Sequence, residues 1–409
     1  MLPSPVGALA LLCMASTLGQ APRHHRVKEE ARWVRASPPV GFAKCSVDFD
    51  AGKGPEAGAP AWATMNNWFF ERKGFCTNGT FARWHAELTS DGGDSIDSRV
   101  YLSAPHFDGV TLFLVGDSLC RDQFVDLVCT LSKQEGTHVT IPYNNLGSTR
   151  YGPHYEQFLA EIRVRSTVFW IAFTYFASLK RDNGYLDHNA KALLSQIALR
   201  KKKWHREALY FAHPLVFHVC SVKAHSLGTR GYSGNYLAYF DELSGLASRL
   251  KNQYGWSAFY YRPGPATHFA TAEAGYIPTS SQFKRESPQQ CSPLKKGANA
   301  QKQLFQHEEN SFVGRLNVTG RVAVVPHVWD LSAGAWNMHP GLAPLRKNHS
   351  QLATDCLHFC VAGDGQVGVY EAFNRLWWWD MLNHVLPADR ATDSATTGRL
   401  MSKHKLHST

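Results

Sequence analysis

The feature that most limits how this chain can fold is an alternation of short apolar runs with helical patterns from Val110 onward. The runs, such as VTLFLV at 110–115, are rich in β-branched and aromatic residues, which favours buried strands. In 236–253 the apolar residues recur at spacings of three and four and Gly255 follows, which predicts a helix and its end. The predicted strands cover 110–115, 137–142, 166–173, 208–212, 257–262 and 321–326, and the predicted helices 119–133, 187–203 and 236–253.

Strands that alternate with helices predict an α/β fold, in which helices cover both faces of a mainly parallel sheet. The 409 residues, 44% of them hydrophobic, are enough for a sizeable core. No internal repeat is apparent. We expect a signal peptide or short signal-anchor at 1–21, a polar linker at 22–44, a loop-rich lobe at 45–105, the main α/β domain at 106–386 and a disordered tail at 387–409.

The first 21 residues predict entry into the secretory pathway. They carry an apolar stretch from Val6 to Leu18 that small residues close, which is typical of a secretory signal. No basic residue precedes this stretch, so a short signal-anchor remains an alternative. Such an anchor is the one membrane tether we expect, because no later segment is apolar for 18 residues.

The cysteines agree with that route. Removal of Cys13 with the signal leaves an even set of eight, which favours disulfides in an oxidising compartment. Metal binding is the alternative, because Cys356, His358 and Cys360 lie close in sequence, but the chain has no CxxC pair for a structural zinc site and we expect no metal. The candidate disulfide cysteines are Cys45, Cys76, Cys120, Cys129, Cys220, Cys291, Cys356 and Cys360, and the candidate glycosylation sites are Asn78, Asn317 and Asn348.

The net charge of +10 is dispersed except for RKKKWHR at 200–206. That run follows a helical pattern, so its simplest interpretation is a solvated helix end whose cations meet the negative end of the helix dipole. A luminal protein is not expected to bind nucleic acid, so an acidic glycan is the functional alternative.

The stretch VGDSLCRDQF at 115–124 places a serine where the first predicted strand becomes a helix. Ligands of parallel sheets bind at the carboxyl ends of the strands, so Ser118 is a candidate nucleophile. Gly116 permits a tight turn, and the amide groups near Asp117 could hold an oxyanion. The alternative is an ordinary helix cap without chemistry. The stretch is not the GxSxG elbow, because Cys120 stands where its last glycine would be.

A serine nucleophile needs a base and a group that orients the base, and ATDCLHFCVAG at 353–363 offers both. Asp355 precedes His358 by three positions, which puts both side chains on one side of a turn or short helix. Disulfides from Cys356 and Cys360 would fix this loop on the main body. The alternative is a surface aspartate beside a structural histidine, because the chain has 20 histidines.

Four blocks in order resemble the trichome birefringence-like proteins of the PC-esterase superfamily. GDSLCRDQ, with Cys129 eleven residues past the serine, is similar to the family's GDSL.RNQ block, and DCLHFCVAG is similar to its DC.HWC.PG block. Between them, YYRPGPATHF at 260–269 resembles R.fsP.HF, and WDLSAGAWNMHPG at 329–341 resembles DIT.LS..R.DGHP. The resemblance covers roughly 45–382 and is faint before Leu112.

The resemblance implies a three-layer, SGNH-hydrolase-like α/β fold with a disulfide-tied N-terminal lobe, in a protein of the Golgi lumen or the extracellular space. It implies transfer or hydrolysis of O-acetyl groups on polysaccharides, with Ser118 as nucleophile, His358 as base and Asp355 as its orienting acid. The partners are then a glycan acceptor and an acyl donor, acetyl-CoA or another acetyl ester, with no bound cofactor. The alternatives are an esterase with the same triad and a non-catalytic glycan-binding protein.

Several positions depart from the family pattern, and the mildest change is Phe359 in place of the family's Trp. Asp122 stands where the family has Asn, and FAHPLVF at 211–217 replaces the NTGHWW block, with Ala212 in place of its Asn. Other side chains would then hold the oxyanion or the acceptor, and the candidates are Gly116, Asp117, Arg121, His213, Arg262, His268 and His339. The run WWWD at 377–380 predicts core packing, with sugar stacking as the alternative.

Overall fold

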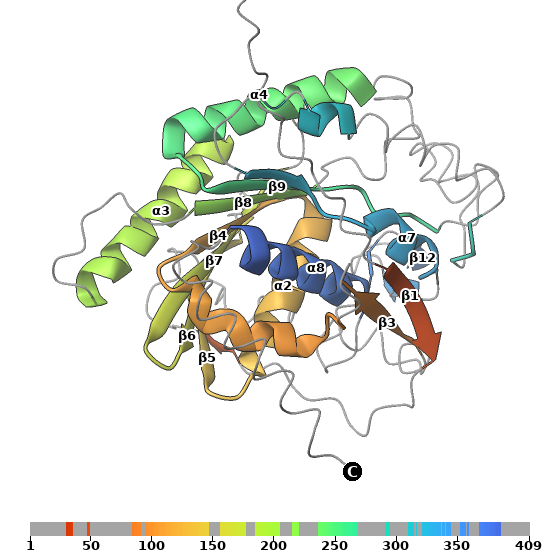
Figure 1. Cartoon of the computed structure of the whole chain (residues 1–409), viewed down its shortest axis with the longest axis horizontal. Helices are drawn as coiled ribbons and strands as arrows, with labels where there is room; N and C mark the ends of the chain where they lie inside the picture. Colours follow the sequence, from red (N-terminus) through yellow and green to blue (C-terminus); the bar gives the residue numbers. More distant parts are fainter. Residues whose placement is uncertain are drawn as a thin grey trace, which may run out of the picture.

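The computed structural model describes residues 30–35, 47–49, 84–90, 95–146, 156–176, 185–204, 215–220, 236–268, 291–294, 310–314, 316, 321–336, 338, 339, 341–344, 352–356, 358, 359 and 368–385. The structural statements below concern these residues. They form an α/β structure around one large sheet (Figure 1).

The central sheet has eight strands in the order β10-β9-β8-β4-β7-β6-β5-β2. Only β6 runs against its neighbours, because a two-residue turn joins it to β7 and forces an antiparallel hairpin. The other pairings are parallel, so the prediction of a mainly parallel sheet is confirmed. The strands are β2 (Asp48–Phe49), β4 (Thr111–Gly116), β5 (Thr137–Leu146), β6 (Glu156–Val164), β7 (Thr167–Tyr175), β8 (Leu215–Cys220), β9 (Ala258–Arg262) and β10 (Arg321–Val324).

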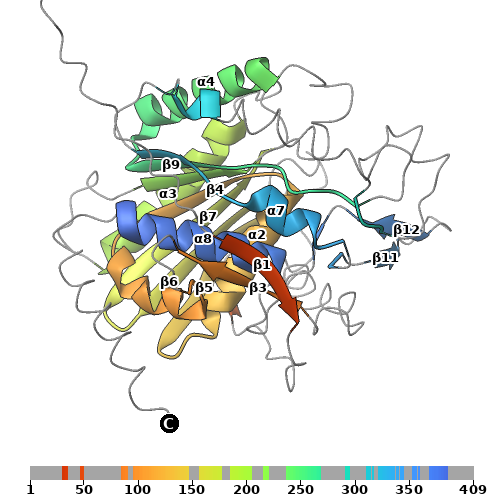
Figure 2. The ribbon, with the colours of Figure 1, turned by 45° about the vertical axis from the view of Figure 1, so that its right-hand side comes forward.

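Helices cover both faces of this sheet, which gives three layers (Figures 1 and 2). One face carries α2 (Ser118–Ser132), α8 (Val369–His384) and the 3-10 helix η4 (Ser98–Phe107), and the other carries α3 (Tyr185–Trp204) and α4 (Tyr236–Tyr254). Every residue of β4 is buried. Leu112 and Leu114 enter the core under α2 and α8, whereas Phe113 and Val115 enter the core under α3 and α4. This alternation explains why β4 is a continuous apolar run.

At the carboxyl end of β4, successive connections of the chain lead to strands on opposite sides of β4. From β4 the chain passes through α2 on one face, and from β7 it passes through α3 on the opposite face to reach β8 on the other side of β4. Parallel sheets bind ligands at such a topological switch point, outside the carboxyl ends of the strands. Ser118 follows β4 at this point.

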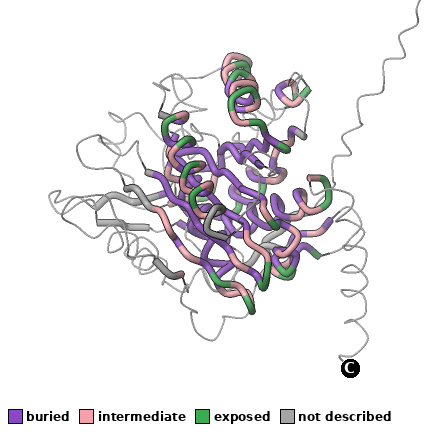
Figure 3. Tube along the Cα trace, turned by 90° about the vertical axis from the view of Figure 1, so that its left-hand side faces the viewer, coloured by how far each residue is buried: buried purple, intermediate pink, exposed green. Residues whose placement is uncertain are grey.

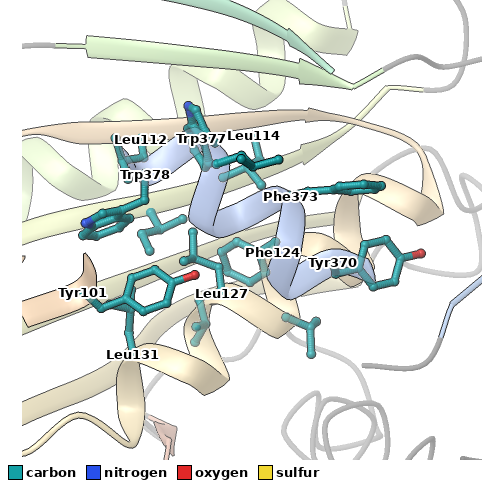
Figure 4. Close-up of a cluster of buried hydrophobic side chains, with 14 of the residues drawn as sticks. Tyr101, Leu112, Leu114, Phe124, Leu127, Leu131, Tyr370, Phe373, Trp377 and Trp378 are labelled. Carbon is teal, nitrogen blue, oxygen red and sulfur yellow. The ribbon is translucent and has the colours of Figure 1, made fainter. Parts of the chain in front are cut away.

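The core under α8 is aromatic (Figure 4). Trp377 and Trp378 are fully buried, and the ring of Trp378 lies 4.3 Å from that of Phe107 and 5.2 Å from that of Tyr101. The indole N–H of Trp378 donates to Ser103 Oγ at 3.1 Å, so the buried donor is satisfied. The prediction that WWWD packs in the core is confirmed for these two tryptophans.

Smaller elements flank the sheet (Figure 2). The strands β1 (Glu30–Arg35) and β3 (Trp84–Thr89) pair antiparallel, as do β11 (Gly341–Pro344) and β12 (Leu352–Asp355), and α7 (Val328–Ala333) precedes β11. Figure 3 shows that the buried part of the trace runs through the central strands, whereas α3 and α4 also present exposed turns to solvent.

The observed structure differs from the predicted one at several places, and the elements α8, η4, α7, β2, β3, β11 and β12 were not among those predicted. The strand β6 was not predicted, and the strand after α3 is β8 at 215–220, whereas the predicted 208–212 lies outside the described residues. The predicted linker contains β1, because its backbone pairs with β3. The expected boundary between the N-terminal lobe and the main domain, after residue 105, falls inside η4. The buried side chains of η4 belong to the main core. The predicted signal segment and tail lie outside the described residues.

A buried ion pair connects α8 with α2 and η4. Arg375 Nε donates to Glu371 Oε1 at 2.8 Å, and both side chains are buried. The other carboxylate oxygen, Glu371 Oε2, accepts from the hydroxyls of Thr130 at 3.1 Å and Tyr101 at 3.3 Å. A buried carboxylate is stable when its oxygens are satisfied, as they are here.

We predict that Glu371→Ala lowers the free energy of unfolding by about 3–5 kcal/mol, because it leaves Arg375 buried without its counter-charge. Urea unfolding of the purified protein measures this change. The matched control is Arg99→Ala, which removes an exposed pair with Asp97 and should cost less than about 1 kcal/mol. Equal losses of unfolding free energy in the two variants would contradict the conclusion that the buried Glu371–Arg375 pair stabilises the fold.

Candidate active site

The turn from β4 into α2 leaves the Ser118 hydroxyl available. Asp117 is the N-cap of α2, and its Oδ1 accepts the backbone N–H of Leu119 at 3.0 Å. Because Asp117 supplies the cap, the alternative interpretation of Ser118 as the capping residue does not hold. Ser118 is half-buried, whereas the rest of α2 is buried.

Gly116 is required at the end of β4 because a disulfide packs directly on it. Cys120 in the first turn of α2 is bonded to Cys220 at the end of β8, although the two are 100 residues apart. A Cβ atom on Gly116 would lie 2.7 Å from Cys120 Cβ and 2.9 Å from Cys220 Cβ, which is closer than real Cβ contacts. The close approach that only glycine permits therefore fixes the start of α2 against the neighbouring strand.

His358 lies against Ser118. The distance from Ser118 Oγ to His358 Nε2 is 2.7 Å, within hydrogen-bond reach, although 240 residues separate the two in sequence. The segment of His358 is held by the disulfide between Cys356 and Cys291, and the N–H of His268 donates to the Cys356 carbonyl at 3.0 Å. The structure thus brings together the two residues that the sequence analysis chose as nucleophile and base.

Asp355 is the last residue of β12, three positions before His358. Its backbone pairs with Gly341 of β11. Its side chain lies outside the described residues, so its contact with the imidazole stays a prediction.

His268 and His339 lie behind His358. His339 Nδ1 is 2.6 Å from the backbone carbonyl of His358, and His339 Nε2 is 2.7 Å from His268 Nδ1. His268 Nε2 is 3.1 Å from the carbonyl of Ala333 in α7. Both rings are buried, and burial lowers the pKa of His268 to about 4, although its hydrogen bond to Ala333 acts in the opposite direction. Both residues are thus hydrogen-bonded within the protein, and a direct role in substrate binding remains a prediction.

The two arginine candidates are also buried. Arg262 ends β9 and is fully buried, and within the described part of the chain none of its guanidinium nitrogens has a hydrogen-bond partner. Its guanidinium lies 5.6 Å from the ring of Phe373. Burial lowers the pKa of Arg262, whereas the negative charge of nearby groups, including Asp117, raises it. Arg121 in α2 has its Nε 3.5 Å from the carboxylate of Asp122.

A polar network under α2 was not predicted. Gln123 Nε2 donates to Asn374 Oδ1 at 2.9 Å, and Gln123 Oε1 is 3.3 Å from His218 Nε2. Asn374 Nδ2 donates to the Gln123 carbonyl at 3.2 Å and to Asp126 Oδ2 at 3.1 Å. All four residues are buried, and burial, followed by the charge of Arg262, holds the pKa of His218 well below its usual value. Gln123 belongs to the GDSLCRDQ block, which was the signal that could have found this network.

The cysteines form disulfides where the structure describes them, which confirms that prediction over metal binding for these residues. Besides the pairs at Cys120 and Cys356, Cys129 is also disulfide-bonded. Among the described residues, no group of three or more histidine, cysteine or acidic side chains could hold a metal ion, and no helix is long and apolar enough to cross a membrane. Eight of the residues singled out in the sequence analysis lie outside the described part of the chain: Cys45, Cys76, Cys360, Asn78, Asn317, Asn348, Ala212 and His213.

A serine and a histidine in contact at the carboxyl end of a central parallel strand are typical of α/β enzymes that use a serine nucleophile. The chain belongs to the PC-esterase family, described as a GDSL/SGNH-like acyl-esterase family found in Pmr5 and Cas1p, whose model matches residues 105–376. This match covers more than half of the chain and establishes an acyl esterase or acyl transferase. No curated protein matches the sequence.

We predict that Gly116→Ala destabilises the protein by about 1–3 kcal/mol and lowers activity, because the new methyl group overlaps both disulfide Cβ atoms. Urea unfolding and a free-thiol assay would measure the loss of stability and of the Cys120–Cys220 bond. The matched control is Gly245→Ala on the exposed side of α4, where nothing lies within 4 Å of the added Cβ. That variant should be stabilised by about 0.5–1 kcal/mol, and equal behaviour of the two would refute the packing argument.

Proposed function

We propose that the protein is an O-acyltransferase that moves an acetyl group onto a hydroxyl of a polysaccharide through an acyl-serine intermediate. The observation that carries the proposal is the distance of 2.7 Å between Ser118 Oγ and His358 Nε2. Family membership supports acyl chemistry at this serine. The acyl donor is acetyl-CoA or another acetyl ester.

In the first half-reaction, Ser118 Oγ attacks the acetyl carbonyl of the donor while His358 Nε2 accepts the serine proton. The tetrahedral intermediate collapses, and the leaving group takes that proton from His358. In the second half-reaction, a sugar hydroxyl gives its proton to His358 and attacks the acyl-serine. The proton then returns to Ser118 Oγ as the acetylated sugar leaves. Asp355 orients His358 and stabilises the imidazolium in both steps.

The developing oxyanion would be held at the N-terminus of α2. The N–H of Leu119 is already occupied by the Asp117 carboxylate, so the N–H of Ser118 is the amide of this turn that is proposed to face the substrate. The positive end of the helix dipole and the buried charge of Arg262 add to the favourable potential. Asp122 does not take the role of the family's asparagine in this proposal, because a carboxylate accepts hydrogen bonds and does not donate them.

A luminal or secreted location belongs to the same proposal. The two described disulfides support it, because structural disulfides persist in oxidising compartments. An acceptor polysaccharide would be met there, in the Golgi lumen or outside the cell. The alternative function is hydrolysis at the same site, which the half-buried position of Ser118 favours because water can reach an acyl-serine there.

We predict that Ser118→Ala lowers kcat by more than about 10³-fold in an assay with an acetyl ester donor and polysaccharide acceptors. Acetate release and polysaccharide O-acetylation are measured in the same reaction. Acetylated polysaccharide in excess of acetate supports the transferase, whereas acetate alone supports the esterase. Glycan binding by a folded protein that a serine-reactive probe does not label would instead indicate a non-catalytic binding protein.

We predict that Asp355→Asn lowers kcat by about 10³- to 10⁴-fold with little change in KM, because the wrong imidazole tautomer would face Ser118. Steady-state kinetics with the same donor measure this effect. The control is Asp380→Asn in α8, whose carboxylate contacts the hydroxyl of Tyr260 and has no proposed role in the reaction. Wild-type kcat in Asp355→Asn would remove the residue from the mechanism.

A further inference from the structure

The two histidines behind the catalytic base form a chain that begins and ends on backbone carbonyls. At one end His339 Nδ1 faces the carbonyl of His358, and at the other His268 Nε2 faces the carbonyl of Ala333. In the middle, His339 Nε2 and His268 Nδ1 are 2.7 Å apart. His268 is fully buried and His339 nearly so, which leaves little room for water to mediate these contacts.

The carbonyls decide which nitrogens carry hydrogen. A carbonyl oxygen only accepts, so His339 Nδ1 and His268 Nε2 must both be N–H donors. A neutral imidazole carries one N–H, so in two neutral rings the facing nitrogens, His339 Nε2 and His268 Nδ1, would both present lone pairs. Two acceptors at 2.7 Å repel each other, whereas a single proton between them makes a charge-assisted hydrogen bond.

We propose that His268 and His339 hold one proton between them beyond the two of neutral imidazoles, and that this proton keeps the loop of His358 in register with Ser118. The inference rests on the proposed function of Ser118 and His358 and deepens it. It makes His268 and His339 positioning residues, because His339 contacts the backbone carbonyl of His358 and His268 contacts His339, and neither contact involves the reacting atoms.

The surroundings of the pair favour the proton on His339. His268 is enclosed by the carbonyl of Ala333, the ring of Phe359 and the ring of His339, and its burial opposes a charge on it. His339 stacks on the ring of Phe359 with centroids 4.4 Å apart, and among the titratable residues of the described part of the chain it contacts His268 and the backbone of His358. A cationic His339 can donate from both nitrogens, to His358 and to His268, while His268 stays neutral.

The shared proton makes the support of His358 sensitive to alkaline pH. In this proposal the folded pair binds the extra proton more tightly than the unfolded imidazoles do, so its stabilisation is present at low pH and is lost as pH rises through the pKa of the pair. Once the proton leaves to solvent, the two lone pairs face each other and His339 must turn away, which removes its hydrogen bond to the His358 carbonyl. The rate of acylation of Ser118 should then fall on the alkaline side.

The first test reads the protonation state directly. Nitrogen NMR of the full chain labelled with ¹⁵N-histidine should show, at neutral pH, one ring of the pair with both nitrogens protonated, assigned by its loss in His339→Asn. The same signal should move to a neutral form at alkaline pH. Two neutral rings at neutral pH would overturn the proposal. Labelling of Ser118 by a serine-reactive probe in the same sample reports on the proposed function independently.

The second test replaces the proton by a fixed donor. In His268→Asn the amide takes the position of Nδ1 and donates to a neutral His339 Nε2, so the pair no longer needs an extra proton. In His268→Gln the amide takes the position of Nε2 and keeps the bond to Ala333, but it offers His339 no partner. The two variants therefore separate the hydrogen bond inside the pair from the bond to α7.

Two quantities are read out: for His268→Asn the pH at which the rate of probe labelling of Ser118 falls, and for His268→Gln the steady-state kcat and KM. His268→Asn should lose the alkaline fall seen in the wild type, whereas His268→Gln should have a kcat about 10- to 100-fold lower with an unchanged KM, the size expected for one hydrogen bond to a charged group. The same alkaline fall in His268→Asn and the wild type would refute the shared proton. If neither variant folds, the NMR result on the wild type decides.

Discussion

The site depends on the contact between Gly116 and the disulfide from Cys120 to Cys220. This disulfide joins the first turn of α2 to β8, the strand next to β4. The turn that carries Ser118 is therefore fixed by β4, which precedes it, and by the covalent link to β8. A side chain at position 116 would push the helix away from the sheet. The glycine thus does more than permit a tight turn, because it allows the disulfide to pack against the turn that carries Ser118. The rest of the site is built outward from that fixed point.

His358, the proposed base, is positioned by a second set of contacts. His358 comes from a segment far along the chain, and the disulfide between Cys356 and Cys291 holds that segment beside the loop of His268. The carbonyl of His358 is in turn bound by His339. A catalytic side chain in a loop must be fixed by its surroundings, because a shift of about 1 Å can cost two orders of magnitude in rate. Here a disulfide and buried imidazoles fix the segment of His358, as a helix or strand would in other sites.

Much of this could be predicted from the sequence, and the reasons differ between elements. Strands such as β4 were predictable because burial on both faces makes them continuous apolar runs. The antiparallel strand β6 was missed because its run EQFLAEIRV mixes apolar residues with charges, of which Glu161 is buried and paired with Arg163. The network of Gln123, His218 and Asn374 was missed because polar residues inside a core leave no periodic pattern. Its partners come from three separate elements.

The departure at Asp122 affects the electrostatics of the site more than its chemistry. A carboxylate at 2% exposure needs compensation, and Arg121 next to it, with Nε at 3.5 Å, supplies a positive charge. An asparagine there could donate to an oxyanion, whereas an aspartate paired with its neighbour cannot. In the proposed mechanism, the transition state would be stabilised by the helix terminus at Ser118 and by the guanidinium of Arg262, whose nitrogens have no hydrogen-bond partner among the described residues.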